Sequence, residues 1–116
     1  MMKIAITSQN RKSITGHAGK CRNFWIYQFN EGQLADKKLV ELAIDQSFHA
    51  SHHEMVEPLA QINVLITGSM GGGLYQRLMQ QGIKPIITSE TNPDEAVAAF
   101  LENRLEHLPF EANHHH

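Results

Sequence analysis

Four glycines fall within six residues in the stretch TGSMGGGLYQRLMQQG, residues 67–82. Three of them, Gly71, Gly72 and Gly73, stand between an apolar run and a helical pattern. Backbone without Cβ atoms lets N–H groups converge on an anion at the positive end of a helix dipole. The same glycines would also suit a tight turn that packs a helix closely on a sheet. The stretch therefore predicts either an anion-binding turn or a purely structural one.

His17 and Cys21 lie four residues apart in a long polar segment and offer an imidazole and a thiolate. Both groups are ligands for iron, copper and zinc. Two such ligands are too few for a bare metal ion, but they suffice for a preassembled cluster that brings its own sulfides. In the alternative interpretation, Cys21 is a buried small hydrophobe and His17 forms hydrogen bonds within the loop. The pair is thus a candidate metal site that could act together with the glycine turn.

Three more histidines, His49, His52 and His53, surround a possible capping box that begins at Ser51. Adjacent residues of a helix point about 100° apart, so His52 and His53 could not face one ion from a helix. His49 and His53 are better placed to converge if the loop folds back. We therefore take these two as further candidate metal ligands, with solvated histidines as the alternative.

Other chemistry finds little support in the sequence. The glycines do not follow the first strand as a dinucleotide fingerprint would, and the Lys-Ser/Thr pair of a P-loop is missing. The first predicted strand carries no carboxylates of the kind that hold two metal ions in nucleases. No nucleophile elbow is present. We therefore expect neither an NAD or ATP site nor an enzyme.

Alternating and continuous apolar runs predict the elements that position these residues. Five strands are expected, at residues 3–7, 24–29, 33–42, 63–67 and 84–88. Helices are expected from about Ser51, despite Pro58, and over residues 74–81 and 93–105. Three strands joined without helices and then two right-handed crossovers give a mixed five-stranded sheet with helices on its faces. Residues 63–67 and 84–88 should run parallel to residues 3–7, and residues 24–29 antiparallel to them.

The helices and turns carry recognisable signals. Asn92 is a predicted N-cap followed by Pro93 at the first helical position. Gly32 should close a hairpin, and Gly82 should end the first of the two later helices in a left-handed conformation. The buried faces of these two helices are expected to be marked by Leu74, Leu78 and Met79 and by Val97, Phe100 and Leu101.

Composition limits the class of protein. The 116 residues carry a net charge of -2, with 41% hydrophobic and 19% charged residues and one cysteine. We expect one domain over residues 1–105 with a tail over residues 106–116, located in the cytoplasm and monomeric by default. Scattered lysines and arginines disfavour nucleic acid, and no apolar run is long enough to cross a membrane.

Four stretches now line up in order along the chain: KIAIT, ITGHAGKCRNFWIYQF, INVLITGSMGGGLYQRLMQQGIKP and NPDEAVAAFLENRL. This order resembles the dinitrogenase iron-molybdenum cofactor biosynthesis family, of the NifX and NafY type. His17 and Gly19 match that family's His-Phe-Gly triplet, with Ala18 in place of the Phe. Gly68 and Gly71 match its glycine segment, with Ser69 in place of the second glycine.

The resemblance implies a ribonuclease H-like three-layer α/β fold. It also implies binding, carriage or chaperoning of an iron-sulfur or iron-molybdenum-sulfur cluster as cargo, with cluster-donor or cluster-acceptor proteins as partners. Gly68 and Ser69 would then belong to the cofactor-binding segment, together with Gly71, Gly72 and Gly73. The resemblance does not establish a role in nitrogen fixation. A regulatory or protein-interaction domain of the same fold, binding another small anion, is the alternative.

Overall fold

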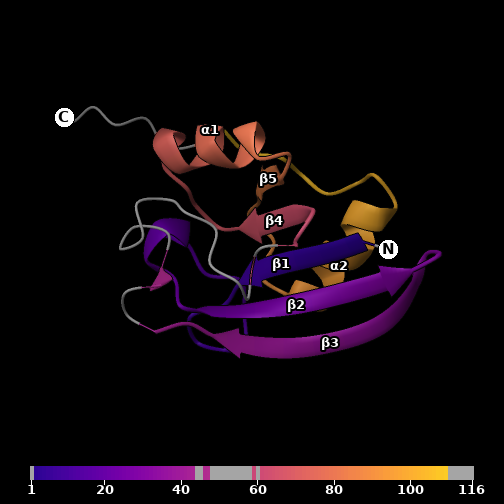
Figure 1. The fold of residues 1–116 in the computed structure, drawn as a ribbon. Coiled ribbons are helices and arrows are strands. Elements are labelled where there is room, and N and C mark those ends of the chain that lie inside the picture. Colours follow the sequence, from indigo (N-terminus) through magenta and orange to yellow (C-terminus); the bar gives the residue numbers. More distant parts are fainter. Residues whose placement is uncertain (1, 44–45, 48–58, 60, 110–116) are drawn as a thin grey trace.

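A computed structural model describes residues 2–43, 46–47, 59 and 61–109 (Figure 1). Within these residues the chain forms five strands, one 3-10 helix and two α-helices. The elements are β1 (Met2–Thr7), η1 (Ala18–Lys20), β2 (Asn23–Asn30), β3 (Gln33–Glu41), β4 (Val64–Thr67), α1 (Gly72–Gln80), β5 (Lys84–Ile87) and α2 (Pro93–Leu101). The helix expected from Ser51, together with His49 and His53, lies outside the described residues.

The strands form one mixed sheet in the order β3-β2-β1-β4-β5. β1 pairs antiparallel with β2 and parallel with β4, and β5 continues the sheet parallel to β4. The predicted mixed five-stranded sheet and the predicted strand directions are therefore confirmed. The ribonuclease H-like assignment stays a prediction.

β2 and β3 form the predicted hairpin, whose turn contains Glu31 and Gly32. Both residues have positive φ, 52° for Glu31 and 82° for Gly32. Two successive positive φ values match the right-handed twist of a hairpin, and glycine adopts such a value without strain. Gly82 also has a positive φ, 77°, directly after α1, as the sequence predicts.

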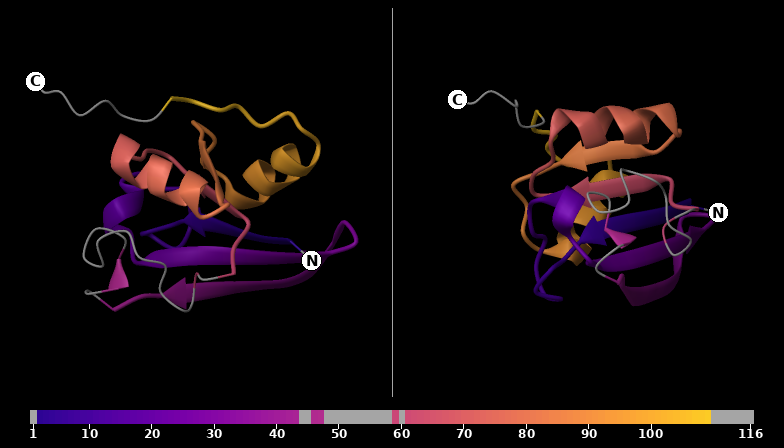
Figure 2. Two further views of the ribbon diagram at one scale, coloured as in Figure 1. Left: turned by 45° about the horizontal axis from the view of Figure 1, so that its top comes forward. Right: turned by 60° about the vertical axis from the view of Figure 1, so that its left-hand side comes forward.

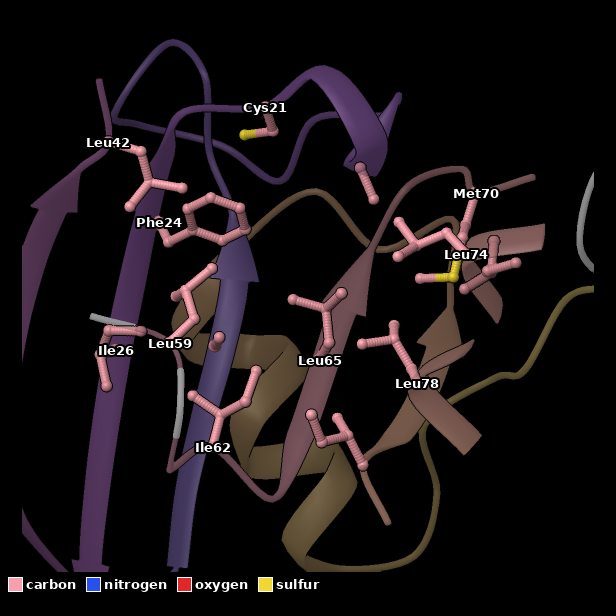
Figure 3. Packing of buried hydrophobic residues seen from close by; sticks show 14 residues of the cluster. Cys21, Phe24, Ile26, Leu42, Leu59, Ile62, Leu65, Met70, Leu74 and Leu78 are labelled. Carbon is pink, nitrogen blue, oxygen red and sulfur yellow. The ribbon is translucent and has the colours of Figure 1, made fainter. Parts of the chain in front are cut away.

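The two α-helices cover opposite faces of the sheet, which gives three layers (Figure 2). Alternating residues of the central strands supply the two cores. On the α1 face, Ala5 and Leu65 pack in a cluster with Leu74 and Leu78 (Figure 3). On the α2 face the cluster contains Ile4, Ile6, Tyr27, Phe29, Val64, Ile66, Ile86, Ala96 and Val97. Both faces of the central strands are thus buried.

The helices differ from prediction in two respects: α2 ends at Leu101, short of the predicted residue 105, and one residue expected on the buried face of each helix is exposed. Met79 and Leu101, expected on buried faces, are 57% and 40% exposed. Met79 follows the fully buried Leu78, and the turn of about 100° between adjacent helical residues points it away from the sheet. On α2 the small side chains of Ala96 and Ala99 are buried instead.

The beginning of α2 is fixed as the sequence predicts. The Asn92 side chain accepts hydrogen bonds from the amides of Asp94 and Glu95, and Pro93 occupies the first turn. The hydroxyl of Tyr27 on β2 donates a hydrogen bond of 2.6 Å to the Asp94 carboxylate, which also receives Lys37 Nζ at 3.0 Å. These bonds tie the N-terminus of α2 to two strands.

The segment after α2 returns to the sheet. The Leu108 amide donates a 2.6 Å hydrogen bond to the Ile87 carbonyl of β5, and Ser89 bonds to the carboxylate of Glu106. Residues 106–108 of the expected tail therefore contact the domain. In the described part of the chain, neither α-helix is long and apolar enough to span a membrane.

We expect Tyr27→Phe to lower the free energy of unfolding by about 1 kcal/mol at neutral pH, because Asp94 loses a hydrogen-bond donor. The bond from Tyr27, followed by that from Lys37, lowers the pKa of Asp94. A carboxyl group of this kind contributes stability above its unfolded pKa of about 3.9 and loses that contribution as pH falls through its folded pKa. The difference between parent and variant should therefore shrink below about pH 4. Urea unfolding at several pH values measures it.

An Asp94→Asn background is the control for this experiment. There the difference made by Tyr27→Phe should no longer vary with pH. A variation that persists would assign the pH dependence to another group.

Candidate functional site

Two loops meet at the carboxyl ends of β1 and β4. The Gly68 amide donates to the Thr15 carbonyl at 3.0 Å, and the Ala18 amide donates to the Ser69 carbonyl at 3.1 Å. In open sheets that contain parallel strands, ligands bind at this edge, where connections diverge to the two faces. The structure thus brings His17 and the glycine turn, far apart in the sequence, to one place.

A buried threonine pair supports this junction. The hydroxyls of Thr7 and Thr67 lie 2.8 Å apart at the ends of β1 and β4, and neither side chain is exposed. Both also lie near the Thr15 carbonyl, at 2.6 Å from Thr7 and 3.2 Å from Thr67. Buried hydroxyls need such partners, so these groups hold the loop after β1 in place. The only sequence signal for them is that two apolar strands each end in threonine.

Gly68 and Gly16 allow the two loops to touch. A Cβ on Gly68 would lie 3.3 Å from backbone atoms of Thr15 and Gly16, and a Cβ on Gly16 would lie 2.4 Å from Ser69 Oγ. Such distances are too short for unstrained packing. Gly68 is therefore a structural glycine, and its amide is already bonded to Thr15.

Ser69 fixes the backbone of His17. The hydroxyl of Ser69 accepts a 2.7 Å hydrogen bond from the His17 amide. His17 has a φ of 54° and an exposed side chain. Non-glycine residues seldom adopt this left-handed conformation, although histidine is enriched among them. Ser69 therefore helps to hold the His17 imidazole toward solvent beside the turn that leads to α1.

Cys21 lies on the inner side of the same loop. Its side chain is 3% exposed and belongs to the α1-face cluster with Phe24 and Leu42 (Figure 3). The thiol donates to the Asn23 carbonyl at 3.1 Å, and burial raises its pKa. A raised pKa disfavours the thiolate that metals need. The structure thus places His17 outside and Cys21 inside, and it does not present the two as one pair of ligands.

The remaining glycines begin α1. Gly71 is the N-cap, with no side-chain cap bond, and a Cβ built on it would meet open space. The Tyr75 amide bonds to the Gly71 carbonyl. Within the described residues no acceptor is found for the amides of Gly73 and Leu74 in the first turn of the helix. These donors, at the positive end of the helix dipole, suit an anion.

Potential metal ligands are few among the described residues of this region. The described residues contain no group of three or more His, Cys, Asp or Glu side chains that could hold a metal ion. His49 and His53 are outside the described residues, so their predicted role stays a prediction. An exposed imidazole and backbone donors that have no acceptor among the described residues suit a preformed anionic group better than a bare cation.

The sheet and its carboxyl edge define an α/β domain in which two loops meet beside the N-terminus of α1. The chain belongs to the dinitrogenase iron-molybdenum cofactor family, whose model matches residues 1–103. The family resemblance noted in the sequence is thereby confirmed. It relates this chain to proteins associated with the iron-molybdenum cofactor of dinitrogenase.

Two relatives are similar in sequence. The chain is 28% identical over 108 residues to an uncharacterized protein of Methanocaldococcus jannaschii, with 91% of each chain covered. It is 27% identical over 111 residues to protein NifY of Azotobacter vinelandii, with 93% of this chain and 45% of NifY covered. The chain thus spans less than half the length of NifY.

Solved structures share the fold. A crystal structure of a second Methanocaldococcus jannaschii protein has a TM-score of 0.72 at 15% identity, covering 95% of this chain and 97% of the other. The apo form of the orange protein from Desulfovibrio gigas has a TM-score of 0.65 at 21% identity, with 95% of each chain covered. At these identities the likeness concerns the fold alone.

Serine substitutions at two glycines test the junction. We expect Gly68→Ser to lower the free energy of unfolding by about 1–3 kcal/mol, because a Cβ would lie only 3.3 Å from backbone atoms of Thr15 and Gly16, which must move slightly to accommodate it. Gly71→Ser should be neutral or slightly stabilising, because its Cβ meets open space and serine is a favourable N-cap. Equal effects of the two changes in urea unfolding would contradict the close approach.

Proposed function

We propose that this protein binds and carries an anionic iron-sulfur or iron-molybdenum-sulfur cluster, or a precursor of one. The observation that carries the proposal is the junction of loops, which brings an exposed imidazole beside the N-terminus of α1 in a chain of this family. The association of this family with the iron-molybdenum cofactor of dinitrogenase supports a metal-sulfur cluster as the cargo. Cytoplasmic donor and acceptor proteins for the cluster would be its partners.

Each part of the site has a separate task in this proposal. His17 supplies a ligand atom, and the amides of Gly73 and Leu74 stabilise negative charge on the sulfides. Ser69 positions His17 through the bond that its hydroxyl accepts from the His17 amide. Gly71 and Gly72 carry no side chains that could block a ligand from the amides of the first turn of α1. Cys21 packs the inner side of the loop.

No step of this function requires catalysis by the chain. A carrier must hold its cargo and then release it, so a single protein ligand supported by hydrogen bonds is suitable. A closed set of four strong ligands would hold a cluster more permanently. Among the described residues the junction presents one exposed ligand, His17, and this fits carriage better than storage.

The second candidate function is a regulatory or interaction domain that binds a different small anion. First-turn amides that have no acceptor among the described residues can donate hydrogen bonds to any oxyanion, and the described residues contain no group of three metal-ligating side chains. In that case His17 would contribute hydrogen bonding and charge but no metal bond.

Substitution of His17 distinguishes the two functions. After anaerobic incubation with iron and sulfide salts, and with residues 114–116 removed, the parent should co-elute with iron, sulfide and charge-transfer absorption. His17→Ala should retain roughly tenfold less cluster, and Ser69→Ala should retain an intermediate amount because His17 is less well positioned. His107→Ala is the matched histidine control and should retain as much as the parent. Full retention by His17→Ala would favour the second candidate.

A side chain at Gly71 tests the amide donors independently of any ligand atom. Gly71→Val places two methyl groups in the open space before the first turn of α1. The variant should stay folded, with a loss of at most about 1 kcal/mol from the weaker cap, and yet retain several-fold less cluster. Circular dichroism and the same elution assay give both quantities. Undiminished retention would show that the cargo lies elsewhere.

A further inference from the structure

A second surface pocket lies at the same end of the sheet, on the α2 face. It has a volume of about 400 Å³ and is open to solvent. Its lining includes Arg11, Lys12 and Ser13 from the loop after β1, Trp25 and Lys37 from the hairpin, and residues 91–94 at the start of α2. The candidate site lies further along the same loop, where η1 covers the other face.

The wall that carries Arg11 and Lys12 is built to a fixed shape. The Asn10 side chain accepts hydrogen bonds from the amides of Lys12 and Ser13, each at 2.9 Å. The Arg11 amide donates to the Ser8 carbonyl at 2.9 Å. The Ile14 amide donates to the Thr91 carbonyl at 2.8 Å, which joins this loop to the opposite wall. The pocket is therefore preformed.

The charged groups in and around the pocket differ in how strongly they are paired. Lys37 bonds to Asp94 at 3.0 Å and lies over the Trp25 ring at 4.9 Å. Arg11 pairs with Glu41 at 3.2 Å, but both side chains are more than half exposed, so the pair is weak and exchangeable. The Lys12 ammonium has no partner among the described residues. Three positive and two negative groups thus leave one free cation and one loosely held cation.

The spacing of these cations favours an extended ligand over a small ion. Arg11 pairs with Glu41, and Lys37 lies four residues earlier than Glu41 on the same strand. Four residues of a β-strand span about 13 Å. A phosphate ion cannot contact both ends of that distance, but a peptide with several carboxylates can, with Trp25 and Pro93 between them as apolar surface.

We propose that this pocket is a docking site for an acidic segment of a partner protein. The partner's role in delivering or receiving the cluster rests on the proposed function. The loop that lines the pocket continues directly to His17, the proposed cluster ligand. Docking here would hold the partner at the edge of the sheet where the cargo is exposed. Recognition would depend on Lys12 and Arg11, with Lys37 kept in place by Asp94.

Trp25, the single tryptophan of the chain, reports directly on the pocket. The probe is hexaglutamate, titrated into the metal-free protein at low salt while Trp25 emission is recorded. Binding should change the emission and should disappear near 1 M salt, where the screening length is about 3 Å. Lys12→Gln should weaken binding about fivefold. Lys38→Gln is the matched control, because Lys38 neighbours Lys37 on β3 but points to the opposite face, and it should bind like the parent.

Three results would overturn the docking proposal. Absence of any emission change would do so, as would equal weakening by Lys12→Gln and Lys38→Gln, which indicates general charge attraction. An emission change with inorganic phosphate at the same total charge, reduced by Lys12→Gln, would assign the pocket to a small anion. Because no cluster is present, failure of cluster carriage would leave this titration unaffected, and failure of the titration would leave the His17 assay unaffected.

Discussion

The contact between the backbone at Gly68 and the backbone at Thr15 and Gly16 is the constraint on which the rest of the edge depends. It joins the loop after β1 to the turn after β4, and the buried hydroxyls of Thr7 and Thr67 satisfy the polar groups enclosed there. Since both strands are central and buried on both faces, the two loops are held by the stiffest part of the fold. A loop of about fifteen residues is thereby given a fixed conformation.

This constraint explains how one loop performs opposite tasks on its two sides. Once Ser69 holds the amide of His17, the following 3-10 turn directs Ala18 and Cys21 into the core and leaves the imidazole in solvent. A bulky aromatic residue at position 18 would have to find room where Ala18 is now completely buried. Ala18, which stands in place of the family's Phe, therefore fits a tightly packed loop that leaves His17 exposed.

Much of the fold could be predicted because its signals are local. Continuous runs of β-branched residues predicted the strands, and Asn92 followed by Pro93 predicted the start of α2. The contact of His17 with Ser69 could not be predicted, since it joins residues 52 apart through a hydroxyl that replaces an expected glycine. Helical spacing also misplaced Met79 and Leu101. It could not show that Met79 would point away from the sheet beside the buried Leu78, or that alanines would supply much of the buried face of α2.

The hydrogen bond from Leu108 to Ile87 protects the molecule from growth by strand addition. β5 and β3 are the two outer strands of the sheet, and Leu108 occupies a carbonyl that β5 would otherwise offer to another chain. The opposite border, β3, carries Lys37 and Lys38 side by side, and lysines on an outer strand oppose the approach of a second copy. Both outer strands of the sheet thus carry features that oppose pairing with a strand of another molecule.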